Sequence, residues 1–85
     1  MTEEINERVE VITVYNREHG ATPFRVRWQG RAYTIRKLAY YHKSRIGRVI
    51  HHIFNVATDT LDIRLEFNSE NLHWILKEVT DGHTN

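Results

Sequence analysis

The chain has 85 residues, of which 40% are hydrophobic and 27% are charged, with one proline, four glycines and no cysteine. This length fits one domain with a single core, and the composition excludes a disulfide framework, thiolate metal sites and extensive disorder. No apolar run approaches the roughly 20 residues that span a bilayer, and the acidic N-terminus lacks the apolar stretch of a signal peptide, so we expect a cytoplasmic protein with no membrane partner.

The charges are distributed unevenly along the chain. Residues 19–58 contain eight basic side chains and no Asp or Glu, whereas the other residues hold four basic and all eleven acidic side chains. The middle therefore carries +8 and the flanks carry −7, beneath a net charge of only +1. This polarity predicts either a basic face or strands that pair opposite charges across a sheet.

Strand patterns dominate the first half of the chain. The β-branched residues in 9–15 predict a first strand, and a loop with Gly20 follows. In residues 23–28 apolar side chains alternate with Arg25 and Arg27, which predicts a strand with one apolar and one basic face. Gln29-Gly30 predicts a tight hairpin turn. The return strand is expected over residues 31–41.

Further strands are expected in the second half. Residues 43–47 predict a turn, residues 49–57 a fourth strand, and residues 58–60 another turn. Residues 61–67 alternate apolar and charged side chains cleanly, which is the clearest strand pattern in the chain. A polar turn at residues 68–71 then leads to the last element, residues 72–79.

Two segments fit a helix as well as a strand. The last element has apolar residues at helical spacing behind a possible Ser69 cap, and Ile35, Leu38 and Ala39 have a similar spacing. We favour strands, because short strands joined by tight turns are consistent with the rest of the chain. The prediction is an all-β domain over residues 9–81, between flexible tails at 1–8 and 82–85. About six antiparallel strands form a meander that makes a small barrel or a strongly bent sheet.

One motif resembles a known family. The run Trp28-Gln29-Gly30-Arg31-Ala32-Tyr33-Thr34-Ile35 has the pattern W-x-G-R-x-Y-x-[VI], and it is followed by His52-Ile53-Phe54-Asn55-Val56, Leu65-Glu66-Phe67 and Trp74-Ile75-Leu76-Lys77-Glu78-Val79. From about Pro23 to Gly82 the chain is similar to a family of small bacterial β domains of unknown function. Related segments occur beside or within accessory proteins of error-prone Y-family DNA polymerases. The resemblance implies a β fold, a bacterial origin and a context of DNA transactions, and it carries over no catalytic or binding residues.

The basic middle of the chain is the main candidate site. Arg25 and Arg27 share the solvent-facing side of their strand. Arginine forms bidentate contacts with phosphate, and aromatic rings stack on unpaired bases. Tyr40 and Tyr41 point to opposite sides of a strand, and the outward ring is the better stacking candidate. We therefore predict binding of DNA or RNA, without strong sequence preference, through Arg25, Arg27, Arg31, Arg36, Lys37, Tyr40, Tyr41, Lys43, Arg45 and Arg48.

Two other interpretations of the basic residues stay open. They can form an ordinary solvated surface, paired with the acidic side chains of adjacent strands, namely Glu10, Asp62, Glu66 and Glu78. The isoelectric point of about 8.2 is low for a dedicated nucleic-acid-binding domain. The alternative function is a protein-interaction module that docks an acidic partner, or a strand at an edge of the sheet.

The sequence gives little support to metal binding or catalysis. His51 and His52 are adjacent on a predicted strand, so their side chains point to opposite faces and do not easily share one zinc ion. His52 lies in phase with Ile50 and Phe54, which predicts a partly buried core histidine. The chain has no glycine-rich phosphate loop and no G-x-S-x-G motif. We expect no metal, no cofactor and no enzymatic activity, and we expect both tryptophans to be core residues.

Overall fold

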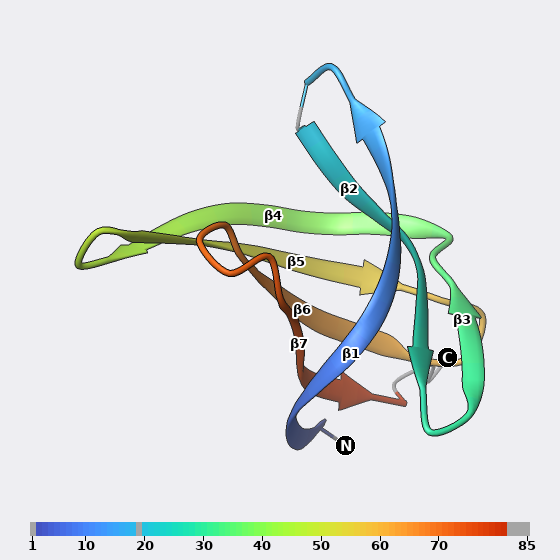
Figure 1. Ribbon diagram of the computed structural model, residues 1–85. Helices are drawn as coiled ribbons and strands as arrows, with labels where there is room; N and C mark the ends of the chain where they lie inside the picture. Colours follow the sequence, from blue (N-terminus) through green and yellow to red (C-terminus); the bar gives the residue numbers. More distant parts are fainter. Residues whose placement is uncertain (1, 19, 82–85) are drawn as a thin grey trace.

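The structure, a computed structural model, describes residues 2–18 and 20–81, and all of its regular elements are strands (Figure 1). In chain order they are β1 (Thr2–Asn16), β2 (Gly20–Trp28), β3 (Arg31–Thr34), β4 (Lys37–Ile46), β5 (Val49–Ala57), β6 (Asp62–Asn68) and β7 (Trp74–Thr80). They form one antiparallel sheet in the order β3-β2-β1-β7-β6-β5-β4. The first and last strands are therefore neighbours. None of the described segments is a helix long and apolar enough to cross a membrane.

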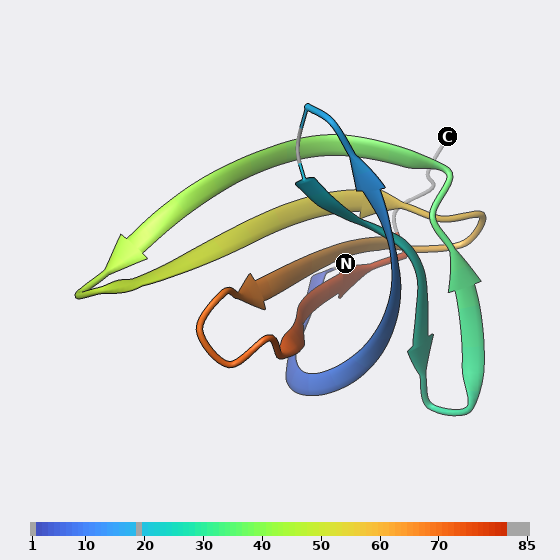
Figure 2. The same cartoon turned by 45° about the horizontal axis from the view of Figure 1, so that its top comes forward.

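The all-β prediction is confirmed. The described residues form seven strands rather than about six, in one sheet that is not closed, so of the two predicted shapes, a small barrel or a strongly bent sheet, the barrel is not formed. The difference arises at Ile35 and Arg36, in the middle of the predicted third strand. Ile35 N–H donates to the carbonyl of Phe24, and Arg36 N–H donates to the carbonyl of Ala57, at 2.9 and 2.8 Å. The chain changes partners here, so β3 pairs with β2 and β4 pairs with β5. The sheet bends strongly, and β3 and β4 remain its two edges (Figure 2).

The first strand starts earlier than the sequence pattern predicts. Residues 2–8 belong to β1 and pair with β7 rather than forming an N-terminal tail. The register shifts between Glu4 and Glu7, where Asn6 has a φ of 55°. The strand conformation of this segment depends on its pairing with β7, which lies more than sixty residues away along the chain. The segment's own sequence is acidic and does not alternate between apolar and polar residues. The C-terminal tail predicted at 82–85 lies outside the described residues.

The two hairpin turns that flank the basic strands contain two residues each. Trp28 pairs with Arg31, and Gln29 and Gly30 between them have φ values of 52° and 75°, as a type I′ turn requires. Ile46 pairs with Val49, so the turn predicted over residues 43–47 is shorter, and β4 continues to Ile46. Gly47 has a φ of 63° at the first central position, which matches a type II′ turn.

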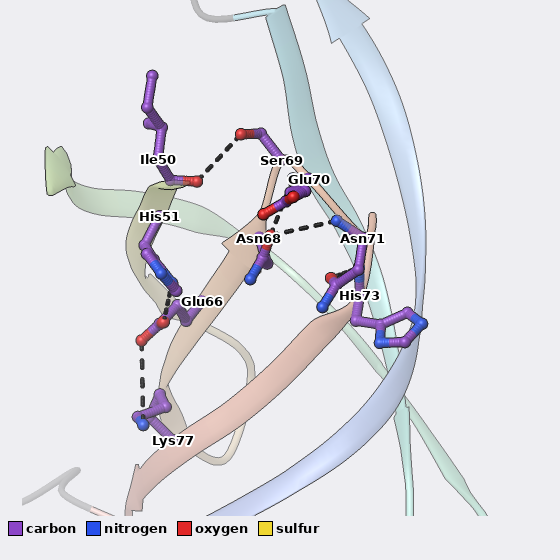
Figure 3. Close-up of polar contacts among 9 residues, drawn as sticks. All are labelled: Ile50, His51, Glu66, Asn68, Ser69, Glu70, Asn71, His73 and Lys77. Atoms are coloured by element: carbon purple, nitrogen blue, oxygen red, sulfur yellow. Dashed lines mark hydrogen bonds and ion pairs between the residues drawn. The ribbon is translucent and has the colours of Figure 1, made fainter. Parts of the chain in front are cut away.

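The last element is a strand, as favoured from the sequence, and it begins at Trp74. Ser69 is not a helix cap. Its hydroxyl donates to the carbonyl of Ile50 at 3.1 Å and thereby ties the β6–β7 turn to β5 (Figure 3). The Asn68 side-chain oxygen accepts hydrogen bonds from the backbone N–H groups of Glu70 and Asn71 at 2.8 and 3.2 Å. The chain therefore turns sharply over the polar residues at 68–71, as predicted.

One face of the bent sheet carries the core, and we call it the inner face and the opposite one the outer face. Its buried side chains are Val26, Phe54, Val56, Ile63, Leu65, Trp74, Leu76 and Val79. Aromatic rings dominate its centre, since the Phe54 ring lies 4.8 Å from that of Tyr41 and 5.5 Å from that of Trp74. Trp28 is half-buried against this cluster, and its Nε1 donates to Glu7 Oε1 at 3.2 Å. Trp74 is therefore a core residue, as predicted, whereas Trp28 packs against the core and is only partly buried.

Candidate nucleic-acid interface

The basic residues of the middle segment lie in two separate groups. Arg25, Arg27 and Arg31 belong to the β2–β3 hairpin, and Lys43, Arg45 and Arg48 belong to the far end of the β4–β5 hairpin. The turns of these hairpins lie at opposite ends of the molecule in both views (Figures 1 and 2). Arg36 and Lys37 lie between them, at the link from β3 to β4. The ten predicted residues therefore do not form one continuous surface.

Arg36 has a partner within the chain. Its Nε and Nη2 donate to Asp59 Oδ1 and Oδ2 at 2.9 and 3.0 Å, a bidentate pair between β3–β4 and β5–β6. The hydrogen bond and the charge attraction raise the pKa of Arg36 and lower the pKa of Asp59. Both side chains are exposed, so solvent screens the pair and its contribution to stability is small. Arg36 is accordingly the member of the basic set least available to an external phosphate.

The other seven basic residues of the middle segment form no ion pair with any described residue. Glu10 lies opposite Arg27 in the β1–β2 register without forming a salt bridge to it. Glu66 pairs instead with His51 and Lys77, on β5 and β7 (Figure 3). The interpretation in which acidic neighbours neutralise these seven residues is therefore not supported by the geometry.

Arg25 and Arg27 stand on the outer face of β1, β2 and β3, which we call the β1–β3 face. They are exposed, while Val26 between them is fully buried on the inner face. Ile12 lies opposite Arg25 and is 55% exposed. A shallow cavity of about 180 Å³ lies here, lined by Glu10, Val11, Ile12, Arg25, Arg27 and Ala32. The β1–β3 face thus combines cationic and apolar surface.

Phe24 adds an exposed aromatic ring beside these arginines. The β1–β2 register shifts between Ile12 and Thr13, so Phe24 is an extra residue between Arg25 and Pro23. A bulge of this kind breaks the alternation of faces. Phe24 is 42% exposed instead of packing with Val26, and Arg25 Cζ lies 5.6 Å from its ring centre. The sequence pattern placed Phe24 on the apolar face. The signal for the bulge was Pro23, since proline within sheets favours edges and bulges.

The two adjacent tyrosines have different environments. Tyr40 is the outward ring, 55% exposed, and its ring centre lies 5.3 Å from that of His42. Tyr41 points inward, where its ring packs against Phe54 and its hydroxyl lies 2.7 Å from Nδ1 of His52. Burial raises the pKa of Tyr41. Tyr41 therefore supports the core, and Tyr40 is the one available for stacking.

The two histidines of β5, His51 and His52, point to opposite faces of the sheet. His51 Nδ1 lies 2.5 Å from Glu66 Oε2, and Lys77 Nζ lies 3.9 Å from Glu66 Oε1 (Figure 3). His52 lies on the inner face, between the rings of Tyr41 and Phe67. Within residues 2–18 and 20–81 no group of three or more histidine and carboxylate side chains is placed to hold a metal ion.

His52 gives the fold a dependence on pH. Burial lowers its pKa, and the positive charge of Lys43 and the neighbouring His51 add to the effect. Below a pH of about 6.5 the unfolded chain protonates this histidine while the folded chain keeps it neutral. We therefore expect its contribution to stability to be complete above that pH and to be lost as the pH falls through the lower folded value. Urea titrations between pH 7.5 and 5 measure this effect. His52→Asn, which does not titrate, should flatten the dependence, and an unchanged slope would contradict the assignment.

No family model, no curated protein and no solved structure matches the chain. The family resemblance, to which residues 28–35 contribute, therefore stays a prediction; these residues contain the end of β2, the turn and β3.

Proposed function

We propose that the domain binds single-stranded nucleic acid on the β1–β3 face, without strong sequence preference. The observation that carries this proposal is the exposed ring of Phe24 beside two arginines, Arg25 and Arg27, that have no ion-pair partner among the described residues. Arg31 is exposed but lies opposite Trp28, in phase with the inner-face residues Val26 and Tyr33, so it is not part of this surface.

The chemistry of this face fits a flexible phosphate backbone with unpaired bases. The guanidinium groups of Arg25 and Arg27 project from alternate positions of one strand, so a strand of phosphates running along β2 reaches both. The ring of Phe24 offers a stacking surface, and stacking tolerates any base because every base has a π-face. In a duplex the base faces are hidden in the stack, so this ring favours single strands.

The same face limits the affinity and the selectivity. Glu10 lies opposite Arg27 and repels phosphate from part of the surface. The exposed Ile12 and Val14 on β1 provide apolar contact with sugars and bases but no hydrogen bonds that tell one base from another. We therefore expect binding in the micromolar range that depends strongly on salt.

Fluorescence anisotropy with labelled single-stranded and duplex oligonucleotides tests the proposal. We expect the single strand to bind more tightly, and the double substitution Arg25→Ala/Arg27→Ala to weaken this binding about tenfold at low salt. Each lost phosphate contact should also reduce the slope of log K against log salt by about 0.7.

The matched control is Arg45→Ala/Arg48→Ala, which also removes two exposed arginines, here from the β4–β5 hairpin at the other end of the molecule. The control should bind like the unmodified protein. An equal loss in both variants would show attraction by the overall charge of the domain and would contradict a site on the β1–β3 face. An absence of binding at low salt would contradict the function itself.

A further inference from the structure

The edge of the sheet at β4 is a second surface, distinct from the β1–β3 face. β4 has ten residues, and within the described part of the chain, residues 2–18 and 20–81, it pairs only with β5 and no strand lies on its other side. Its last residues, Arg45 and Ile46, pair with residues of β5 that lie beyond the end of the β5–β6 pairing at His51. The β4–β5 turn is an extremity of the molecule in both views (Figures 1 and 2). Edge strands of this length are places where an extended segment of another chain can add to a sheet.

The register shows which backbone groups of this edge point outward. In a two-residue hairpin the two residues next to the turn, here Ile46 and Val49, form hydrogen bonds to each other. Along the two strands, such hydrogen-bonded pairs alternate with pairs whose backbone groups do not bond to each other. Lys43, opposite His52, and Arg45, opposite Ile50, are in the second kind of pair. Their N–H and C=O groups therefore face away from β5, where an added strand would bond.

The charge of this hairpin selects the occupant. Neither β4 nor β5 contains an Asp or a Glu. The side chains of Lys43 and Arg45 are exposed, lie in phase with each other, and form no ion pair with a described residue. Opposite charges across neighbouring strands attract and like charges repel. A second copy of β4 would set Lys43 and Arg45 against the same cations, so an acidic strand fits this edge and self-pairing does not.

We propose that the β4 edge binds an extended acidic peptide of a partner protein as an eighth strand of the sheet. Acidic residues at alternate positions of this peptide lie beside Lys43 and Arg45. The intervening residues lie on the outer face beside Tyr40, which is 55% exposed, and His42, and there an apolar side chain covers the tyrosine ring. Recognition thus combines backbone hydrogen bonds with a charge pattern that repeats every second residue.

The test uses a fluorescein-labelled peptide of alternating glutamate and valine and the full domain. We expect binding by anisotropy, together with slower exchange of the Lys43 and Arg45 backbone amides by NMR. The double reversal Lys43→Glu/Arg45→Glu should weaken this binding on the order of tenfold or more, since two attractive pairs become repulsive, and should create binding to a lysine–valine peptide. Both side chains are exposed, and an amide spectrum of the variant verifies that the fold is kept.

Two controls separate strand addition from simple charge attraction. A backbone N-methylated glutamate–valine peptide keeps the charge but lacks hydrogen-bond donors, so it should bind much more weakly. Lys43→Pro should bind more weakly than Lys43→Ala, because both lose the charge and only proline loses the outward N–H. Equal binding of the methylated peptide, or amides whose exchange is unchanged, would overturn the proposal. Arg25→Ala/Arg27→Ala should bind the peptide normally, so failure here and failure of nucleic-acid binding are distinguishable.

Discussion

Replacing Phe54 by alanine is expected to lower the free energy of unfolding by about 3–5 kcal/mol. Phe54 lies on β5 in the middle of the core, and only 1% of its surface is exposed. Its ring contacts those of Tyr41 and Trp74 from the two sides, so alanine leaves a cavity that neither neighbour fills without leaving its own position. Domains of this size are typically stable by about 5–15 kcal/mol, so this one change removes a large part of the total.

Urea unfolding followed by circular dichroism measures the effect. The matched control is Tyr40→Ala on the adjacent strand, which removes a ring that is 55% exposed and should cost about 1 kcal/mol or less. A similar loss in both variants would mean that the inner face is not the core of this domain.

Replacing Phe24 by alanine is expected to weaken binding of single-stranded oligonucleotides by about 10- to 100-fold. An aromatic side chain that stacks on a base is worth about 1–3 kcal/mol. In this protein the ring is 42% exposed, and the guanidinium of Arg25 lies over it, 5.6 Å from its centre, so a base stacks on the part of the ring that Arg25 does not cover. The fold should tolerate the change, because Phe24 is not among the side chains packed against the core.

Two further variants define what the Phe24 ring contributes. Phe24→Trp should keep or improve the affinity, whereas Phe24→Leu, which is apolar but not aromatic, should lose most of what alanine loses. Anisotropy titrations at one fixed salt concentration give this comparison. Leucine binding as tightly as phenylalanine would show that the ring provides apolar contact only, and the stacking role would then be wrong.

Much of the fold follows from local sequence pattern. The alternation in residues 61–67, the Gln29-Gly30 turn and the polar turn at 68–71 depend on neighbouring residues alone, and the structure contains each of them. The strand at residues 2–8 and the break at Ile35-Arg36 depend on partners far along the chain. The first needs β7, and the second needs the carbonyl of Ala57. A local sequence pattern does not reveal contacts between residues so far apart in the chain.

The candidate site was predictable in composition but not in arrangement. The run of basic residues is visible in the sequence, yet two hairpins that point to opposite ends divide it. Arg36 is paired with Asp59, which lies 23 residues further along the chain, so it is less available to a ligand. The alternation in residues 23–28 predicts Phe24 on the same face as Val26, and a single bulged position reverses this. In a strand of alternating faces, one extra residue exchanges the buried and exposed sets beyond it.

The most direct test of the central claim is an NMR titration of the labelled domain with a short single-stranded oligonucleotide. The account predicts that the amide shifts change mainly in residues 10–14 of β1, in β2 from Phe24 to Arg27, and in β3. Shifts confined to the β4–β5 turn, or scattered evenly over all basic residues, would contradict a nucleic-acid site on the β1–β3 face.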